Sequence, residues 1–378
     1  MRGVSLQPVF LSVMALALVA CGAGSPAASR ASTAAQQAAD APPAAAAAPA
    51  AEAAAPASQT PAELVPVRGG LLPSILSAPI FAGADLGIYR QNGLDVTVEP
   101  FTVTSDIMTL IAGGRLEFGQ VTMGAAALNA YNRGLDLITT AAGSIGLLQV
   151  LVRKDLWDSG AIRSPRDLKG VRFALNGRGV IIEYSMYKVL EKGGLTPDDV
   201  EVVVLPWPDQ ITALGNHAID IGLVGEPLGA LAVSRGVAVI MEEKEPGQAD
   251  PWYAPGLQGG LLMMNRPWAE ANPAAATAVI KSYLQTARRI QGAKIYDEPE
   301  VLASIEKWVN VKPEVVKTGA PPLWVLNGRV DMDMLMDAQR YFIDTGATDY
   351  RDPLPPERLY NDRYLNDALA EIGTVSDH

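Results

Sequence analysis

The chain has 378 residues, of which 49% are apolar, so it is long and apolar enough to build a sizeable core. Its formal net charge of -11 argues against a nucleic-acid partner, because phosphate backbones are bound by clustered Lys and Arg side chains. The chain contains one cysteine and two histidines. A disulfide framework, a thiolate or imidazole metal site, a Ser-His-Asp triad and a bound cofactor are therefore not expected.

The N-terminus has the pattern of a secretory signal peptide. An apolar run covers residues 9–20, and at about 12 residues it is too short to span a bilayer of about 30 Å. Residues 18–21 read Leu-Val-Ala-Cys, which resembles the bacterial lipobox, where cleavage precedes a cysteine that carries diacylglycerol. The resemblance implies a signal peptide over 1–20 and a lipid on Cys21 that anchors the protein at the extracytoplasmic face of the cell membrane. An ordinary signal peptide with a leftover thiol is the alternative.

A tether follows the lipidated cysteine. Residues 22–62 are mainly Ala, Pro, Ser and Gln, with almost no large apolar side chain. Such a segment cannot offset the entropy of ordering, so 21–62 is expected to be a flexible linker that lets the folded part reach a membrane partner.

Short apolar runs then alternate with helical patterns, which predicts an α/β fold of parallel strands covered by helices. In the first part of the folded chain, expected strands cover 65–72, 94–101, 118–121, 136–142 and 149–152, and expected helices cover 78–92, 104–112 and 125–133. Gly93 is expected to end the first of these helices in the left-handed conformation.

A second set of the same kind follows. Expected strands cover 171–175, 200–205, 218–223 and 237–241, and expected helices cover 181–192, 210–216 and 228–235. His217 is expected on the surface of a helix. A strand over 257–264 is expected to return the chain to the first part, and helices over 272–291, 298–309, 313–319 and 332–345 are expected to pack there as a scaffold.

The pattern predicts two α/β lobes joined by crossings near Leu151 and Gly260, with a ligand cleft at the strand ends. This is the architecture of a type II periplasmic binding protein. The expected boundaries are 63–151 for the first lobe, 152–258 for the second, and 259–378 for the return to the first lobe with its C-terminal helices.

Several framework segments resemble the nitrate, sulfonate and thiamine-precursor binding family. They are 78–94, 167–170 and 194–200. The resemblance implies a monomeric solute-binding lipoprotein that delivers a small molecule to an ABC permease and its ATPase. One group of that family makes a thiamine pyrimidine with a cysteine-rich iron motif, which a chain with one cysteine cannot form, so enzymatic activity is not expected. A ligand sensor without transport is the alternative class.

The candidate ligand residues lie in loops at the expected cleft, where free backbone N–H groups at helix starts bind acceptor atoms. They are Ser77, Pro79, Thr104, Thr122, Met123 and Gly124 on the first lobe, and Asn176, Gly177, Gly179, Trp207, Glu226, Trp252 and Tyr253 on the second. Trp207 is expected to stack on a planar ligand, with Glu226 and the N–H groups around Gly177 fixing its polar edge. An ordinary glycine turn, a core tryptophan and an exposed acid are the plainer alternatives.

The ligand itself is predicted from charge. Nitrate or a sulfonate calls for fixed cationic donors, yet Arg178 is the sole cation in the candidate loops. A neutral heterocycle fits that composition better. Riboflavin is therefore favoured, because the tether and loops look most like the riboflavin-binding members, ahead of a thiamine-type pyrimidine and then a sulfonate or another anion.

Overall fold

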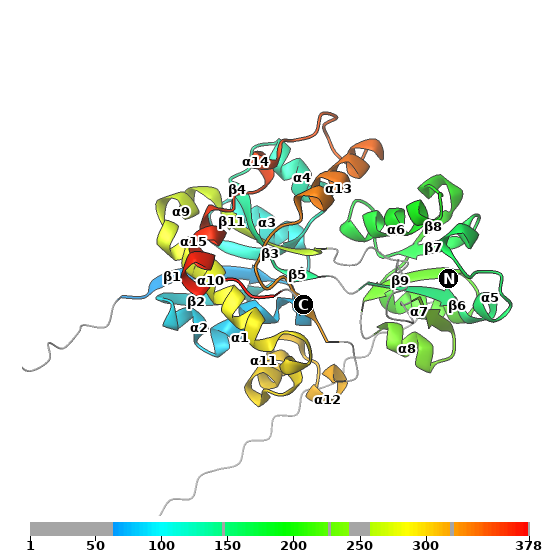
Figure 1. Cartoon of the computed structure of the whole chain (residues 1–378), viewed down its shortest axis with the longest axis horizontal. Coiled ribbons are helices and arrows are strands. Elements are labelled where there is room, and N and C mark those ends of the chain that lie inside the picture. The colour runs from blue at the N-terminus through cyan, green and yellow to red at the C-terminus, as the bar shows by residue number, and fades with distance from the viewer. Residues whose placement is uncertain (1–62, 146–147, 226–227, 242–257, 318–320, 377–378) are drawn as a thin grey trace, which may run out of the picture. The chain divides into compact units, whose positions relative to one another are not determined.

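The computed structural model describes residues 63–145, 148–225, 228–241, 258–317 and 321–376 (Figure 1). Contacts divide the chain into Met1–Ser58 and Gln59–His378, and the described residues all belong to the second unit. They build an α/β protein around two five-stranded sheets. Within these ranges no helix has the length and apolar character needed to cross a membrane.

The first sheet has the order β2-β1-β3-β11-β4. Its strands are β1 (Val65–Leu71), β2 (Leu94–Pro100), β3 (Phe118–Thr122), β4 (Leu137–Ala142) and β11 (Gly260–Asn265). Strand β1 pairs with β2 and β3 in parallel, as expected, but β11 runs antiparallel to β3 and β4. The returning strand therefore enters the sheet between β3 and β4 in the opposite direction. We call this sheet with its helices the first lobe.

The second sheet has the order β10-β6-β9-β7-β8 and forms the second lobe. Its strands are β6 (Leu148–Arg153), β7 (Arg172–Leu175), β8 (Glu201–Val204), β9 (Ile221–Gly225) and β10 (Ala238–Ile240). Strand β6 pairs with β9 from Leu148 onward. The crossing between the sheets therefore lies before Leu148, a few residues ahead of the expected position near Leu151.

Helices cover both sheets. Those before β11 are α1 (Ala78–Asp85), α2 (Ile88–Gln91), α3 (Thr104–Ala112), α4 (Ala125–Asn132), α5 (Lys154–Asp158), α6 (Ile181–Lys192), α7 (Trp207–Gly215) and α8 (Leu228–Ser234). The expected helix over 78–92 is divided into α1 and α2, because Gly87 adopts a φ of 71° between them. His217 has a φ of 63° in the turn after α7, so its expected place on a helix is wrong.

The C-terminal third is mainly helical. Its helices are α9 (Arg266–Ala271), α10 (Pro273–Ile290), α11 (Pro299–Val309), α12 (Pro313–Val316), α13 (Met332–Asp344), α14 (Pro356–Leu359) and α15 (Arg363–Ile372). Helix α10 packs against α1 and α15, and it buries Tyr283 and Leu284 in the first lobe (Figure 1). Two short strands, β5 (Ser144–Ile145) and β12 (Leu323–Trp324), pair antiparallel.

Helix α13 makes one contact that the sequence did not predict. It packs against α4 of the first lobe, as expected, and it also contacts α6 of the second lobe. Its amphipathic pattern does not reveal how many partners it has.

Candidate functional site

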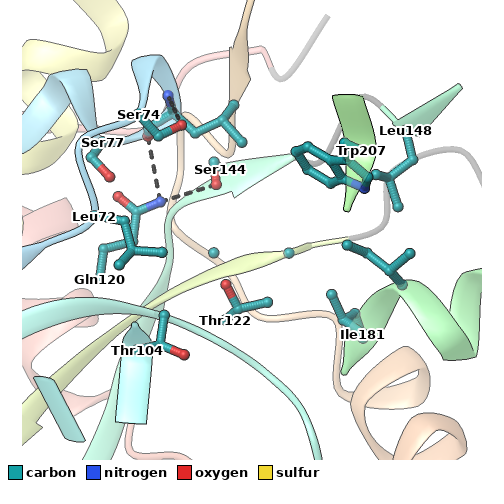
Figure 2. Close-up of a pocket in the computed structure, with 14 residues that line it drawn as sticks. Leu72, Ser74, Ser77, Thr104, Gln120, Thr122, Ser144, Leu148, Ile181 and Trp207 are labelled. Atoms are coloured by element: carbon teal, nitrogen blue, oxygen red, sulfur yellow. Dashed lines mark hydrogen bonds between the residues drawn. The ribbon is translucent and has the colours of Figure 1, made fainter. Parts of the chain in front are cut away.

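A cavity of about 140 Å³ opens between elements of the two lobes (Figure 2). It is lined by Leu72, Ser74, Leu76, Ser77, Thr104, Gln120, Thr122, Ser144, Leu148, Ile181, Ile182, Trp207, Gly259 and Gly260. None of these described residues is charged. The cavity is thus a small polar and apolar site to which both sheets contribute.

Several helices begin at the cavity wall. Ser77 is the N-cap of α1, Thr104 is the first residue of α3, and Trp207 is the first residue of α7. Helix α6 begins with Ile181 and Ile182, which also line the cavity. The first N–H groups of a helix have no partner within it, and the helix dipole places a partial positive charge there. Together these helix starts favour a ligand with negative charge, without any cationic side chain.

The first lobe supplies a polar wall. Gln120 on β3 is 8% exposed, and its Nε2 donates to Ser144 Oγ at 3.1 Å and to the Leu76 carbonyl oxygen at 3.4 Å (Figure 2). The opposite amide atom, Gln120 Oε1, is buried without a hydrogen-bond partner. A Cβ at Gly260 would lie 2.3 Å from Ser144 Oγ, so the close approach of β11 to this pair requires glycine.

The second lobe supplies an apolar wall made of Leu148, Ile181, Ile182 and Trp207. The Trp207 ring rests against the end of β9, where a Cβ at Gly225 would lie 3.2 Å from its six-membered ring. Trp207 Nε1 is buried and donates to no acceptor among the described residues. The ring therefore offers the cavity an apolar surface, whereas its N–H group is buried.

The structure brings some of the candidate residues together and separates others. Ser77, Thr104, Thr122 and Trp207 line the cavity. Two first-lobe candidates, Pro79 in α1 and Met123, are buried and are not among the lining residues. Four candidates lie outside the described residues, namely Cys21, Glu226, Trp252 and Tyr253.

The loop before α6 touches the first lobe directly. The Ala125 N–H donates to the Gly179 carbonyl oxygen at 2.9 Å, and Gly124 forms an isolated bridge with Val180. A Cβ at Gly124 would lie 2.7 Å from that carbonyl oxygen. Gly124 and Gly179 therefore form a close contact between the lobes, and neither is among the residues that line the cavity.

The polar groups of this loop are already engaged. Glu183, which is 5% exposed, accepts a hydrogen bond from the Gly179 N–H at 2.6 Å and pairs with Arg178 at 2.8 Å. Asn176 and Gly177 do not line the cavity. The expectation that N–H groups of this loop bind the ligand is therefore corrected at Gly179, because Glu183 occupies that donor. The Arg178 cation is likewise held by Glu183.

Sequence reasoning missed part of the wall. Gln120, Ser144 and Leu148 line the cavity but were not among the candidates. One available signal was Gln120, a polar residue inside a run otherwise expected to be a buried strand, since buried polar groups need partners. Ser144 and Leu148 flank residues 146–147 at the crossing and carried no comparable signal.

Comparison with known proteins gives a match to a family model described as NMT1-like over residues 60–308. A taurine-binding periplasmic protein of Escherichia coli is 27% identical over 53% of this chain and 59% of its own length. A nitrate/nitrite binding protein of Nostoc is 24% identical over 66% of this chain and 59% of its own length. A nitrate import ATP-binding protein of Synechocystis is 21% identical over 72% of this chain, which spans 42% of that relative.

Solved structures show the same fold. The periplasmic aliphatic sulphonate binding protein of Escherichia coli has a TM-score of 0.61 and 16% identity, with 79% of this chain and 99% of that chain covered. A desulfurization enzyme has a TM-score of 0.52 and 14% identity, with 82% of this chain and 99% of that chain covered. The two-lobed fold thus occurs in binding proteins and in an enzyme, and fold alone does not separate these functions.

Proposed function

This chain belongs to the NMT1-like family, and on that premise we propose that it is the solute-binding protein of an ABC-type importer and captures a small sulfonate-type anion between its lobes. Its partners would be a membrane permease and an ATPase. The relatives described above, whose names refer to taurine, nitrate and nitrate import, support this class of ligand and this role.

The observation that carries the proposal is the convergence of the α1, α3, α6 and α7 starts on one cavity. Each start contributes the partial positive charge of its helix dipole, which favours an oxyanion. The donors differ between the starts, because Pro79 and Pro208 have no N–H group and the Glu183 N–H already donates to the Val180 carbonyl oxygen. The preference for a neutral heterocycle rested on the scarcity of cationic side chains in the candidate loops, and that reasoning left out the helix ends. Riboflavin was favoured among such ligands because the tether and loops look like those of riboflavin-binding members. An anion, ranked third by sequence reasoning, is the better supported ligand.

The size and apolar wall of the cavity favour an organic anion over an inorganic one. A cavity of about 150 Å³ holds a molecule of the size of benzene, whereas a flavin has a fused three-ring system and a sugar-alcohol chain. The cavity measures about 140 Å³. Nitrate would leave Leu148, Ile182 and Trp207 without a partner, but a short alkyl group would cover them. In a sulfonate with a short apolar substituent, the anionic group would contact the polar wall and the substituent would cover the apolar wall.

A calorimetric titration series tests this proposal. We expect short alkanesulfonates, such as propane-1-sulfonate and pentane-1-sulfonate, to bind in the micromolar range or tighter, because both walls are used. Nitrate and taurine should bind at least tenfold more weakly, since neither carries an apolar tail. Binding of riboflavin with quenched flavin fluorescence, and no heat with any sulfonate, would contradict the proposal.

A binding role is also favoured over catalysis by the chemistry of the chain. Its one cysteine is Cys21, and its histidines are the exposed His217 and the terminal His378. Among the described residues, no group of three or more His, Cys, Asp or Glu side chains could hold a metal ion. The polar groups at the cavity are hydroxyls, an amide and backbone N–H groups, which bind anions but do not transfer protons readily near neutral pH.

We further propose that Cys21 carries the lipid anchor. Replacing it by Ser should abolish incorporation of radiolabelled palmitate and release the protein from the membrane, because the serine hydroxyl does not replace the acylated thiol. Affinity for pentane-1-sulfonate should be unchanged, since the cavity residues all lie beyond residue 70. Labelling that persists in Cys21→Ser would exclude this anchor.

A further inference from the structure

The contact between α6 and α13 lies outside the cavity and joins the two lobes. Helix α13 and the chain after it are held on the first lobe. Asp349 pairs with Arg133 at 2.8 Å, and its N–H donates to Asn129 Oδ1 at 2.8 Å at the end of α4. The Asn361 N–H donates to the Thr139 carbonyl oxygen on β4 at 3.0 Å. Helix α13 therefore belongs mechanically to the first lobe.

The side chains of α6 and α13 contact each other at successive turns of the two helices. Tyr184 OH donates to Asp337 Oδ2 at 2.7 Å, and Lys188 Nζ reaches the same oxygen at 3.2 Å. One turn further along α13, the Tyr341 ring stacks on Tyr187 with centroids 4.8 Å apart and an interplanar angle of 26°. Tyr184 and Lys188, like Asp337 and Tyr341, are four residues apart, so each helix presents one face to the other.

The aromatic part of this contact is buried, and its charged part is partly exposed. Tyr184 is 2% exposed and Tyr341 is 6% exposed, whereas the side chains of Lys188 and Asp337 are 25% and 38% exposed. Burial and the hydrogen bond to Asp337 raise the pKa of the Tyr184 hydroxyl well above its ordinary value, so it stays protonated and donates to that carboxylate. A hydrogen bond to a charged acceptor in a partly dry contact is stronger than a neutral one.

The first turn of α6 reaches the cavity. Ile181 and Ile182 line it, and Gly179, two residues before the helix, accepts the interlobe hydrogen bond from Ala125. Helix α6 is 12 residues long and continuous, so its two ends move together. Separation of the lobes at the cavity would therefore pull Tyr184 and Lys188 away from Asp337.

We propose that Asp337 and Tyr341 are positioning residues of the binding site, which hold α6 against the first lobe and thereby set ligand affinity without touching the ligand. The inference rests on the proposed function, because it takes the cavity between the lobes as the ligand site. A contact present in the closed form alone stabilises that form, and the observed affinity rises with the population of the closed form.

A double-mutant cycle across the lobes tests the inference. The variants are Tyr184→Phe, which keeps the ring, Asp337→Ala, and the combination of both. Exposed Asp344 at the end of the same helix provides the matched control, Asp344→Ala. We expect each single variant to weaken binding of pentane-1-sulfonate about three- to tenfold through faster dissociation, and the control to leave it unchanged. The double variant should bind no more weakly than Asp337→Ala, because each residue acts through the other.

Hydrogen exchange of the ligand-free full chain gives a readout that does not depend on the ligand. The Ala125 amide reports closure, since its acceptor Gly179 belongs to the other lobe. Exchange there should be faster in Asp337→Ala than in wild type, with exchange in β3 and β9 unchanged. Asp337→Asn, which keeps an acceptor for the Tyr184 hydroxyl, should restore part of the protection.

The outcomes separate this inference from the proposed function. If the wild type binds no sulfonate, the proposed ligand is wrong, and the exchange of Ala125 still decides whether the helices hold the lobes together. Exchange at Ala125 that is the same in wild type and Asp337→Ala would overturn the inference. So would affinity losses that simply add in the double variant, or losses matched by Asp344→Ala.

Discussion

Replacing Asp220 by Ala is expected to lower the free energy of unfolding of the second lobe by about 3 kcal/mol. Asp220 precedes β9, and its side chain is 13% exposed. It accepts hydrogen bonds from Arg153 at 2.6 Å and from the Arg172 guanidinium at 2.7 Å, and it also accepts the Arg172 backbone N–H at 2.9 Å. These bonds join β6, β7 and β9. Without the carboxylate, Arg153, whose side chain is 10% exposed, keeps Asp155 as its remaining ion-pair partner.

Urea unfolding followed by circular dichroism measures this effect. The matched control is Asp95→Ala, which removes the partner of Arg90 from a pair whose side chains are 53% and 64% exposed. Solvent screens such a pair, so its loss should cost about 1 kcal/mol or less. Equal losses in the two variants would mean that the Asp220 cluster is no stronger than a surface pair.

The Asp220 contribution should also depend on pH. Burial alone would raise the pKa of its carboxyl, but hydrogen bonds and charge from Arg172, with the charge of Arg153, outweigh burial and lower that pKa. A carboxyl whose folded pKa lies below its unfolded value of about 3.9 stabilises the fold fully above that value. The stability difference between wild type and Asp220→Ala should thus be constant from about pH 7 to 5 and shrink below about pH 4.

Local periodicity was sufficient to predict much of the fold. The α3 and α6 bounds, Thr104–Ala112 and Ile181–Lys192, agree with the prediction, because apolar residues at helical spacing end there at Gly113 and Gly193. The direction of a strand within its sheet could not be predicted in this way. The sequence of β11 does not indicate that it pairs antiparallel with β3, since side-chain alternation is the same in both directions.

The site was predicted only in part, because some of its contacts join residues far apart in the sequence and because the prediction did not consider helix dipoles. Ser77 and Thr104 were found because helix starts can be located from sequence. Trp207 was found as a large aromatic residue directly after a predicted strand, although the helix was expected to begin only at residue 210. The contact of Tyr184 with Asp337 joins residues 153 positions apart, and no local pattern reveals such a pair. The prediction of a neutral ligand counted cationic side chains and left out the helix dipoles, on which the proposed anion depends.

The charge of the ligand can be tested with one position in the cavity. Thr122 ends β3 and lines the cavity, so a carboxylate placed there would face the ligand (Figure 2). We expect Thr122→Asp to bind pentane-1-sulfonate about 100-fold more weakly than Thr122→Asn, because like charges a few ångströms apart in a partly dry site repel by about 3 kcal/mol. Asn has nearly the same shape as Asp, so the pair differs mainly in charge.

The comparison remains informative if the ligand has been assigned wrongly. Any anion should discriminate between Thr122→Asp and Thr122→Asn, and the ratio should fall as salt is added, because ions screen the part of the repulsion that passes through solvent. A neutral heterocycle such as riboflavin should bind the two variants with similar affinity. Circular dichroism before each titration confirms that both variants are folded. A ratio near one for a ligand that the wild type binds tightly would show that the helix starts at this cavity do not select an anion.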